Sequence, residues 1–177
     1  MAEHQITFKE ERKDFQAHLA HINQNRNPVS LLLDRVHDIR NVGAIFRLAD
    51  SARIRKVYIY KSPDWKLTSQ KAIRIARQTI QYVPYEILEE LEEVKNLKEN
   101  HQLIALEWTN KSIPYTEFAP KEETILILGN EQFGISDDLL ALAETSIHIP
   151  MLGVNTSMNV ACAAGIVVYD LLKTLRS

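Results

Sequence analysis

The sequence predicts an α/β fold with a mostly parallel sheet flanked by helices. Short apolar runs typical of buried strands alternate with segments whose apolar residues recur at helical spacing. Of the five glycines, all but Gly165 lie just after predicted strands or at helix starts. The chain has 177 residues and 45% apolar content, which suits one globular domain with a substantial core. Strands that alternate with helices imply a sheet covered on both faces.

The N-terminal part, residues 1–28, is expected to be a helical extension ahead of a single catalytic domain over 29–177. Thr7 and Glu10 have the spacing of a capping box, in which each side chain satisfies a free backbone amide. A polar helix is predicted from there to about Ile22.

The remaining elements follow from apolar periodicity. Helices are predicted around the apolar positions of 45–52, 69–78, 87–97 and 160–175. Strands are predicted at 29–33, 56–60, 80–83, 103–106, 125–128 and 147–149.

Composition excludes several protein classes. No apolar run approaches the roughly 18 residues that a membrane span needs, and the N-terminus lacks the pattern of a secretory signal. Cys162 is the single cysteine, so an intramolecular disulfide is impossible and a cytoplasmic location is predicted. The six histidines are scattered, and one cysteine cannot complete a zinc set, so no metal site is predicted.

The charge is unevenly distributed although the net charge is only −2. Residues 53–77 are mainly basic, whereas residues 86–99 are mainly acidic. Two interpretations stay open: a basic face for a nucleic acid, or two solvated surfaces without a partner.

Motif 1, residues 41–47, reads Asn-Val-Gly-Ala-Ile-Phe-Arg at the start of a predicted helix. Asn41 can cap that helix. Gly43 and Arg47 are four residues apart and share a helical face about opposite the apolar stripe. Arg47 is therefore either a solvated arginine or a residue held beside a phosphate or a reacting hydroxyl.

Motif 2, residues 128–136, contains two glycines that follow a predicted strand. Ser136 can cap the next helix. Turn chemistry explains the serine and the glycines but not Glu131, a carboxylate at a strand end, so Glu131 is a candidate functional residue.

Motif 3, residues 149–159, leads into the last helix, which Ser157 or Thr156 can cap. Asn159, on the first turn, is either structural or a donor to a ligand. Apolar Met151, Leu152 and Met158 are either core residues or walls of an adenine pocket.

Other enzyme motifs do not occur in the sequence. There is no Gly-x-Gly-x-x-Gly dinucleotide loop, no Gly-Lys-Ser/Thr phosphate loop and no Gly-x-Ser-x-Gly nucleophile elbow.

Together, the three motifs resemble those of the SpoU/TrmH branch of the SPOUT RNA methyltransferases. Motif 1 is similar to the family's Asn-x-Gly-x-x-x-Arg, motif 2 to its Gly-x-Glu-x-x-Gly-[Leu/Ile]-Ser, and motif 3 to its Ile-Pro-Met…Ser-Leu-Asn-Val. The resemblance covers about residues 29–175, and it departs mildly at Met158, where Leu is common, and at Ala161, where Ser is frequent.

The resemblance implies a C-terminal trefoil knot, an exception to the usual avoidance of knots. It also implies a homodimer with sites at the interface, and transfer of a methyl group from S-adenosylmethionine to a ribose 2′-hydroxyl. The implied cofactor-binding residues are Leu106, Gly129, Asn130, Gly134, Ile149, Met151 and Met158. The implied catalytic residues are Arg47, Asn41, Glu131, Ser157 and Asn159.

Two roles for Arg47 remain open: the base that the family proposal assigns to it, or a group that positions phosphate and stabilises developing charge. Residues 53–77 are the expected RNA-binding surface, with tRNA favoured over rRNA as the target. The alternatives are a non-catalytic RNA-binding or ribosome-assembly protein of the same fold, and an unrelated small-molecule α/β enzyme.

Overall fold

The computed structural model describes residues 14–61, 67, 69–121 and 123–175, and its sheet confirms the α/β prediction. Seven strands form one sheet in the order β3-β2-β1-β6-β4-β7-β5, and every pairing is parallel. The strands are β1 (Val29–Asp34), β2 (Val57–Tyr60), β3 (Tyr85–Leu88), β4 (Gln102–Leu106), β5 (Ile113–Pro114), β6 (Thr124–Leu128) and β7 (Thr145–His148).

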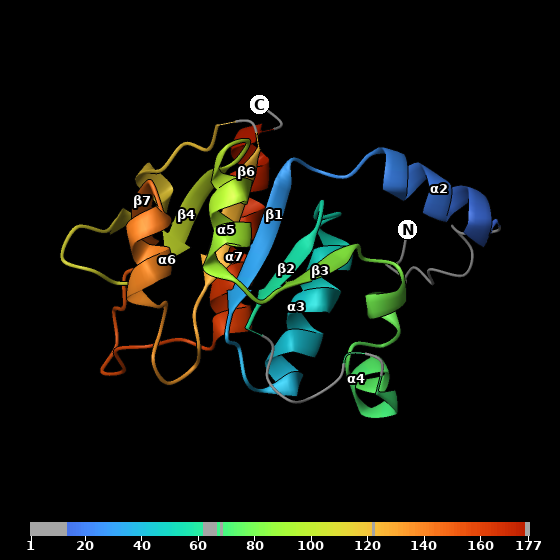
Figure 1. The fold of residues 1–177 in the computed structure, drawn as a ribbon, viewed down its shortest axis with the longest axis horizontal. Helices are drawn as coiled ribbons and strands as arrows, with labels where there is room; N and C mark the ends of the chain where they lie inside the picture. The colour runs from blue at the N-terminus through green and yellow to red at the C-terminus, as the bar shows by residue number, and fades with distance from the viewer. Residues whose placement is uncertain (1–13, 62–66, 68, 122, 176–177) are drawn as a thin grey trace, which may run out of the picture.

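Helices cover both faces of this sheet (Figure 1). They are α2 (Phe15–Gln24), α3 (Ile39–Ser51), α4 (Gln70–Ile75), α5 (Leu91–Lys98), α6 (Asp137–Leu142) and α7 (Val160–Leu175), with short 3₁₀ turns η1 (Thr79–Gln81) and η2 (Tyr115–Glu117).

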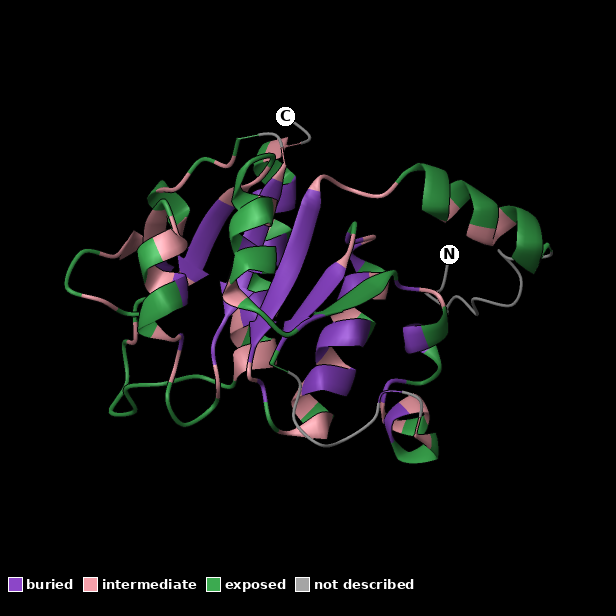
Figure 2. Cartoon of the chain, viewed as in Figure 1, coloured by how far each residue is buried: buried purple, intermediate pink, exposed green. Residues whose placement is uncertain are grey.

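The core has two halves, one on each face. All six residues of the central strand β1 are buried, and its side chains alternate between the halves because successive residues of a strand point to opposite faces. Leu31 and Leu33 pack with the apolar sides of α3 and α7, whereas Leu32 packs with those of α5 and α6. Figure 2 shows the buried strands between helices whose outer sides are exposed. A strand buried on both faces explains the nearly continuous apolar run in the sequence.

Helix α2 lies beside the sheet domain and has no buried residue. Asp14 caps it by accepting a hydrogen bond from the amide of Ala17. Phe15 packs edge-on against Tyr82, with 5.5 Å between ring centroids. The predicted capping box at Thr7 and Glu10 lies outside the described residues.

The sequence prediction is wrong between residues 79 and 90. The strand predicted at 80–83 is instead the turn η1 and the two residues after it. Ile80 and Val83 are buried, but a tight turn rather than a strand buries them. The helix predicted from residue 87 begins only at Leu91, since Ile87 and Leu88 belong to the edge strand β3. Strand β5 and turn η2 were not predicted.

No helix in the described part of the chain is long and apolar enough to cross a bilayer. Among the same residues, no group of three or more histidine, cysteine, aspartate or glutamate side chains is arranged to hold a metal ion.

Candidate active site

A cleft of about 460 Å³ opens beside the carboxyl ends of β6, β4 and β7. This is the edge at which ligands bind in open parallel sheets. All seven residues predicted to bind a cofactor line this cleft, as do three of the five predicted catalytic residues. The seven are Leu106, Gly129, Asn130, Gly134, Ile149, Met151 and Met158, and the three are Glu131, Ser157 and Asn159.

Motif 2 closes on itself in the wall of this cleft. The amide of Asn130 donates to the carbonyl of Gly134, and the amide of Gly134 donates back to the carbonyl of Asn130, both at 3.0 Å. A Cβ atom on Gly129 would lie 2.5 Å from the carbonyl carbon of Gly134, so only glycine permits this close approach. Gly134 itself has φ +67°, a left-handed conformation that glycine adopts without strain.

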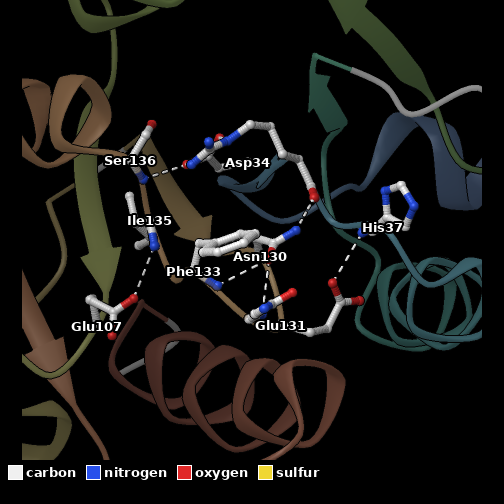
Figure 3. Close-up of polar contacts among 10 residues, drawn as sticks. Asp34, His37, Glu107, Asn130, Glu131, Phe133, Ile135 and Ser136 are labelled. Atoms are coloured by element: carbon white, nitrogen blue, oxygen red, sulfur yellow. Dashed lines mark hydrogen bonds and ion pairs between the residues drawn. The ribbon is translucent and has the colours of Figure 1, made fainter.

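The side chain of Asn130 holds the loop from inside (Figure 3). Its Oδ1 accepts hydrogen bonds from the amides of Gln132 and Phe133 at 2.9 and 3.1 Å. Its Nδ2 donates to the carbonyl of Arg35 at 2.7 Å, which joins the loop to the end of β1. Hydrogen bonds within the protein therefore fix the orientation of the Asn130 side chain without a ligand.

Two carboxylates that sequence reasoning missed hold the far end of motif 2 (Figure 3). Asp34, at the end of β1, accepts from the amide of Ser136 at 2.6 Å. Glu107, after β4, accepts from the amide of Ile135 at 3.0 Å. Asp34 is completely buried, and an ion pair with Arg35 at 2.9 Å balances its charge. The available signal in the sequence was an acidic residue at the end of the apolar runs that form β1 and β4.

Glu131 joins motif 2 to the start of α3. Its two carboxylate oxygens accept from the amides of His37 and Asp38, each at 3.1 Å, and from Nδ2 of Asn41 at 2.7 Å. Partial desolvation raises the pKa of Glu131, but the hydrogen bonds outweigh it, so the pKa lies below its ordinary value. The carboxylate is thus charged at neutral pH, and its negative charge is stabilised by the positive end of the helix dipole at the N-terminus of α3.

Asn41 and Asn159 extend this contact to motif 3. Nδ2 of Asn159 donates to Oδ1 of Asn41 at 2.9 Å. Oδ1 of Asn159 accepts from the amides of Ala161 and Cys162, so Asn159 caps α7. Three of the predicted catalytic residues, Asn41, Glu131 and Asn159, therefore form one hydrogen-bonded chain across the three motifs.

Several predicted helix caps are wrong. Asp38, not Asn41, caps α3, because its side chain accepts from the amide of Arg40 at 2.8 Å and frees Asn41 to reach Glu131. Asn159 replaces Ser157 and Thr156 as the cap of α7. Ser136 occupies the N-cap position of α6, but its buried hydroxyl has no hydrogen-bond partner among the described residues.

Arg47 lies apart from this chain of contacts. It is exposed on α3, and its side chain makes no hydrogen bond or ion pair with any residue that the structure describes. Six residues separate it from Asn41, so it lies about 9 Å further along the helix axis. Its guanidinium is available to a ligand beyond the cleft wall.

Motif 3 is much more exposed than motif 2. Leu152 and Val154 are 97% and 102% exposed, and a Cβ atom on Gly153 would meet nothing within 4 Å. Within the described structure, residues 150–158 make no hydrogen bond of their own. Apolar side chains this exposed indicate a surface that binds a ligand or another protein chain.

Two cations of the basic stretch 53–77 are paired with carboxylates. Arg55 pairs with Glu123 at 3.0 Å and Lys56 pairs with Glu86 at 2.5 Å, whereas Lys66 lies outside the described residues. Three cations on and after α4, which packs against α3, instead line a hollow. They are Lys71, Arg74 and Arg77.

Comparison with known proteins gives a consistent result. A model of the SpoU rRNA Methylase family matches residues 28–169. The chain is 27% identical over 143 residues to the tRNA (guanosine(18)-2′-O)-methyltransferase of Escherichia coli strain K12, covering 80% of this chain and 62% of that relative. The chain thus spans less than two thirds of that relative's length.

Two solved structures share the fold. The A. aeolicus TrmH/SpoU tRNA modifying enzyme superposes with a TM-score of 0.78 at 22% identity, over 91% of this chain and 84% of the other. The AdoMet-bound rRNA methyltransferase from Sinorhizobium meliloti superposes with a TM-score of 0.77 at 25% identity, over 88% and 61%.

Proposed function

The chain belongs to the SpoU rRNA Methylase family, and we propose that it transfers a methyl group from S-adenosylmethionine to a ribose 2′-hydroxyl of RNA. The observation that carries the proposal is that motifs 1, 2 and 3 are joined by Asn41, Glu131 and Asn159 beside one cleft. The relative from E. coli is named as a 2′-O-methyltransferase.

The cleft suits S-adenosylmethionine in size and chemistry. Its volume of about 460 Å³ lies in the range of small-molecule sites. Aliphatic walls from Leu106, Ile149 and Met151 suit a purine, and the glycines of motif 2 bring backbone polar groups to the surface. When bound, S-adenosylmethionine supplies a methyl group that its sulfonium charge activates.

The residues of motif 1 act on the acceptor side of the cleft. A ribose hydroxyl is a weak nucleophile until its proton is removed, so it must be aligned and assisted. A guanidinium does not lose its proton in proteins. We therefore assign to Arg47 the binding of an RNA phosphate and the stabilisation of negative charge that develops on the hydroxyl oxygen. Asn41, held by Glu131 and Asn159, orients the ribose.

The RNA target is proposed to be tRNA rather than rRNA. The E. coli relative is named for tRNA, while the S. meliloti structure is named for rRNA. The hollow that Lys71, Arg74 and Arg77 line is the proposed contact for the RNA backbone, because these exposed cations lie on an element packed against α3. Binding through such contacts weakens steeply as salt rises.

A homodimer and a C-terminal knot complete the proposal. Leu152 and Val154 in motif 3 and Ile166 and Tyr169 on α7 are exposed apolar residues, and a second copy of the chain would cover them. The knot is supported by the fold shared with SpoU enzymes. In this proposal, motif 3 lies at the centre of the assembly.

Incubation with radiolabelled S-adenosylmethionine and undermodified total RNA tests the proposal. We expect label in tRNA, and nuclease digestion to yield 2′-O-methylated nucleosides. Lys95→Ala, a surface change at a residue paired with Glu92 on α5, should incorporate as much label as the wild type. Cofactor binding without transfer to any RNA would overturn the proposal and favour a non-catalytic RNA-binding protein.

A further inference from the structure

We propose that Trp108 and His148 form an aromatic wall that contacts the purine nucleoside part of the cofactor. Both residues lie outside motifs 1, 2 and 3, and both line the cleft. This inference rests on the proposed function, because it specifies how the cofactor end of the cleft binds its ligand.

The two rings are stacked in a fixed arrangement. Their centroids are 5.6 Å apart and their planes differ by 9°. His148 ends β7 and Trp108 follows β4 by two residues, and these strands pair directly through Leu106 and Ile147. The backbone is held further, because the amide of Trp108 donates to the carboxylate of Glu107 at 3.1 Å. A rigid sheet edge therefore positions both rings.

Trp108 is 57% exposed although it lines a cleft. A single exposed aromatic residue needs no functional explanation. An indole that a histidine ring orients at a cleft wall is different, because it offers a flat surface with little conformational entropy left to lose on binding. Aromatic surfaces of this kind bind nucleobases by stacking.

Ser112 holds the ring of His148 in place. The hydroxyl of Ser112 donates to the carbonyl of Thr109 at 2.9 Å and accepts from the amide of Thr109 at 3.1 Å. Oγ of Ser112 also lies 2.9 Å from Nδ1 of His148. Nε2 of His148 makes no hydrogen bond with any described residue, so it can pair with a hydroxyl or an amine of a nucleoside.

The position of the wall favours the cofactor over the acceptor RNA. The strand order places β7 three strands from β1, which precedes motif 1, a separation of about 14 Å. The acceptor ribose belongs beside Asn41 and Arg47, and the methyl group must lie next to it. The nucleoside part of the cofactor therefore extends toward β4 and β7, where Trp108 and His148 lie.

Fluorescence of Trp108 tests this assignment directly. Trp65 is the only other tryptophan in the sequence, so the full-length Trp65→Phe protein reports on Trp108 alone. We expect its emission to change on titration with S-adenosylhomocysteine and with adenosine, and to stay constant with methionine. Calorimetry on the same protein gives the affinity independently of activity.

Matched variants separate the two rings. Trp108→Ala should weaken binding of S-adenosylhomocysteine about tenfold, and Trp108→Phe should weaken it less. His148→Phe keeps a ring but removes Nε2, and should weaken binding about fivefold. Ile87→Ala, at an exposed apolar residue of the edge strand β3, should bind as the wild type does.

The outcomes are distinguishable. Normal calorimetric binding with unchanged Trp108 emission and no loss in Trp108→Ala would overturn this inference and leave the proposed function intact. An emission change with RNA but not with S-adenosylhomocysteine would assign the wall to an acceptor base and also overturn it. Failure of S-adenosylhomocysteine to bind at all would overturn the proposed function together with the inference.

Discussion

Motif 2 and motif 3 line the same cleft but are held in place differently. In motif 2, backbone amides from Gln132 to Ser136 are satisfied by residues of the protein itself, through Asn130, Glu107 and Asp34. In motif 3, Leu152 and Val154 are almost fully exposed, and residues 150–158 make no hydrogen bond within the described structure.

This difference indicates two different roles. A loop whose polar groups are already paired is preformed, and it binds a ligand without a further loss of conformational entropy. A loop with exposed apolar side chains and unpaired amides has contacts still to make. We infer that motif 2 is the fixed wall of the cleft, whereas motif 3 is completed by the cofactor and by a second copy of the chain.

The largest expected effect is on the rate of methyl transfer, and it distinguishes the role of motif 1 from the roles of motifs 2 and 3. Arg47→Ala should lower the rate of methyl transfer by about 10³, as loss of a charged donor at a reacting oxygen does. Affinity for S-adenosylhomocysteine should be nearly unchanged, because Arg47 does not line the cleft. Single-turnover rates and calorimetry measure the two quantities. Near-normal turnover would remove Arg47 from the mechanism.

A double substitution tests the role of the exposed loop. Leu152 and Val154 are exposed in the single chain and would be buried in the proposed dimer. Leu152→Glu with Val154→Glu should therefore weaken association of two copies by about a hundredfold or more. Light scattering should then show a monomer for the variant and the proposed dimer for the wild type, with unchanged circular dichroism. Equal masses for the variant and the wild type would show that motif 3 is not the interface.

The glycines of the two loops provide a matched pair. Gly134→Ala places a Cβ atom 2.5 Å from Oε2 of Glu107 at a φ of +67°, a conformation that costs a side chain about 1–2 kcal/mol. We expect the Tm to fall by about 5 °C. Gly153→Ala, which meets nothing within 4 Å, should leave the Tm unchanged. Equal shifts would mean that the two loops are equally ordered.

The smallest expected effect concerns Glu131 and pH. Its folded pKa lies below the ordinary value of 4.5, so its contribution to stability is fully present above pH 4.5 and is lost as the pH falls through the folded pKa. Because Glu131 is exposed, this contribution is about 1 kcal/mol or less. Glu131→Gln should lower stability at pH 7 and make it less sensitive to acid. The measurement is urea unfolding of both proteins at a series of pH values. If the free energy of unfolding depends on pH equally in both proteins, this assignment is contradicted.

The sequence predicted the parallel sheet because its central strands are continuous apolar runs bounded by turns. It failed at Ile87, where an exposed edge strand carries an apolar residue at a spacing that also fits a helix. A four-residue strand is too short for periodicity to decide. The edge of the sheet was therefore predicted less well than its centre.

The cleft residues were predicted because motifs 1, 2 and 3 were recognised together. The contacts that hold these residues in place were not predicted, because they join distant parts of the chain. Asp34 and Ser136, for example, are 102 residues apart in sequence. Local capping rules suggested Asn41 and Ser157 as helix caps, but Asp38 and Asn159 take those roles. Hydrogen bonds between distant residues thus determine which polar side chains are used as helix caps and which are available in the candidate active site.

The proposed activity of this chain is methylation of ribose 2′-hydroxyls in RNA. Transcriptome-wide mapping of 2′-O-methylated nucleotides in cells with and without the gene tests it, with Arg47→Ala as a rescue control. We predict that one or a few tRNA positions lose methylation without the gene, and that the wild type but not Arg47→Ala restores it. Identical maps in the two cell lines would contradict this activity.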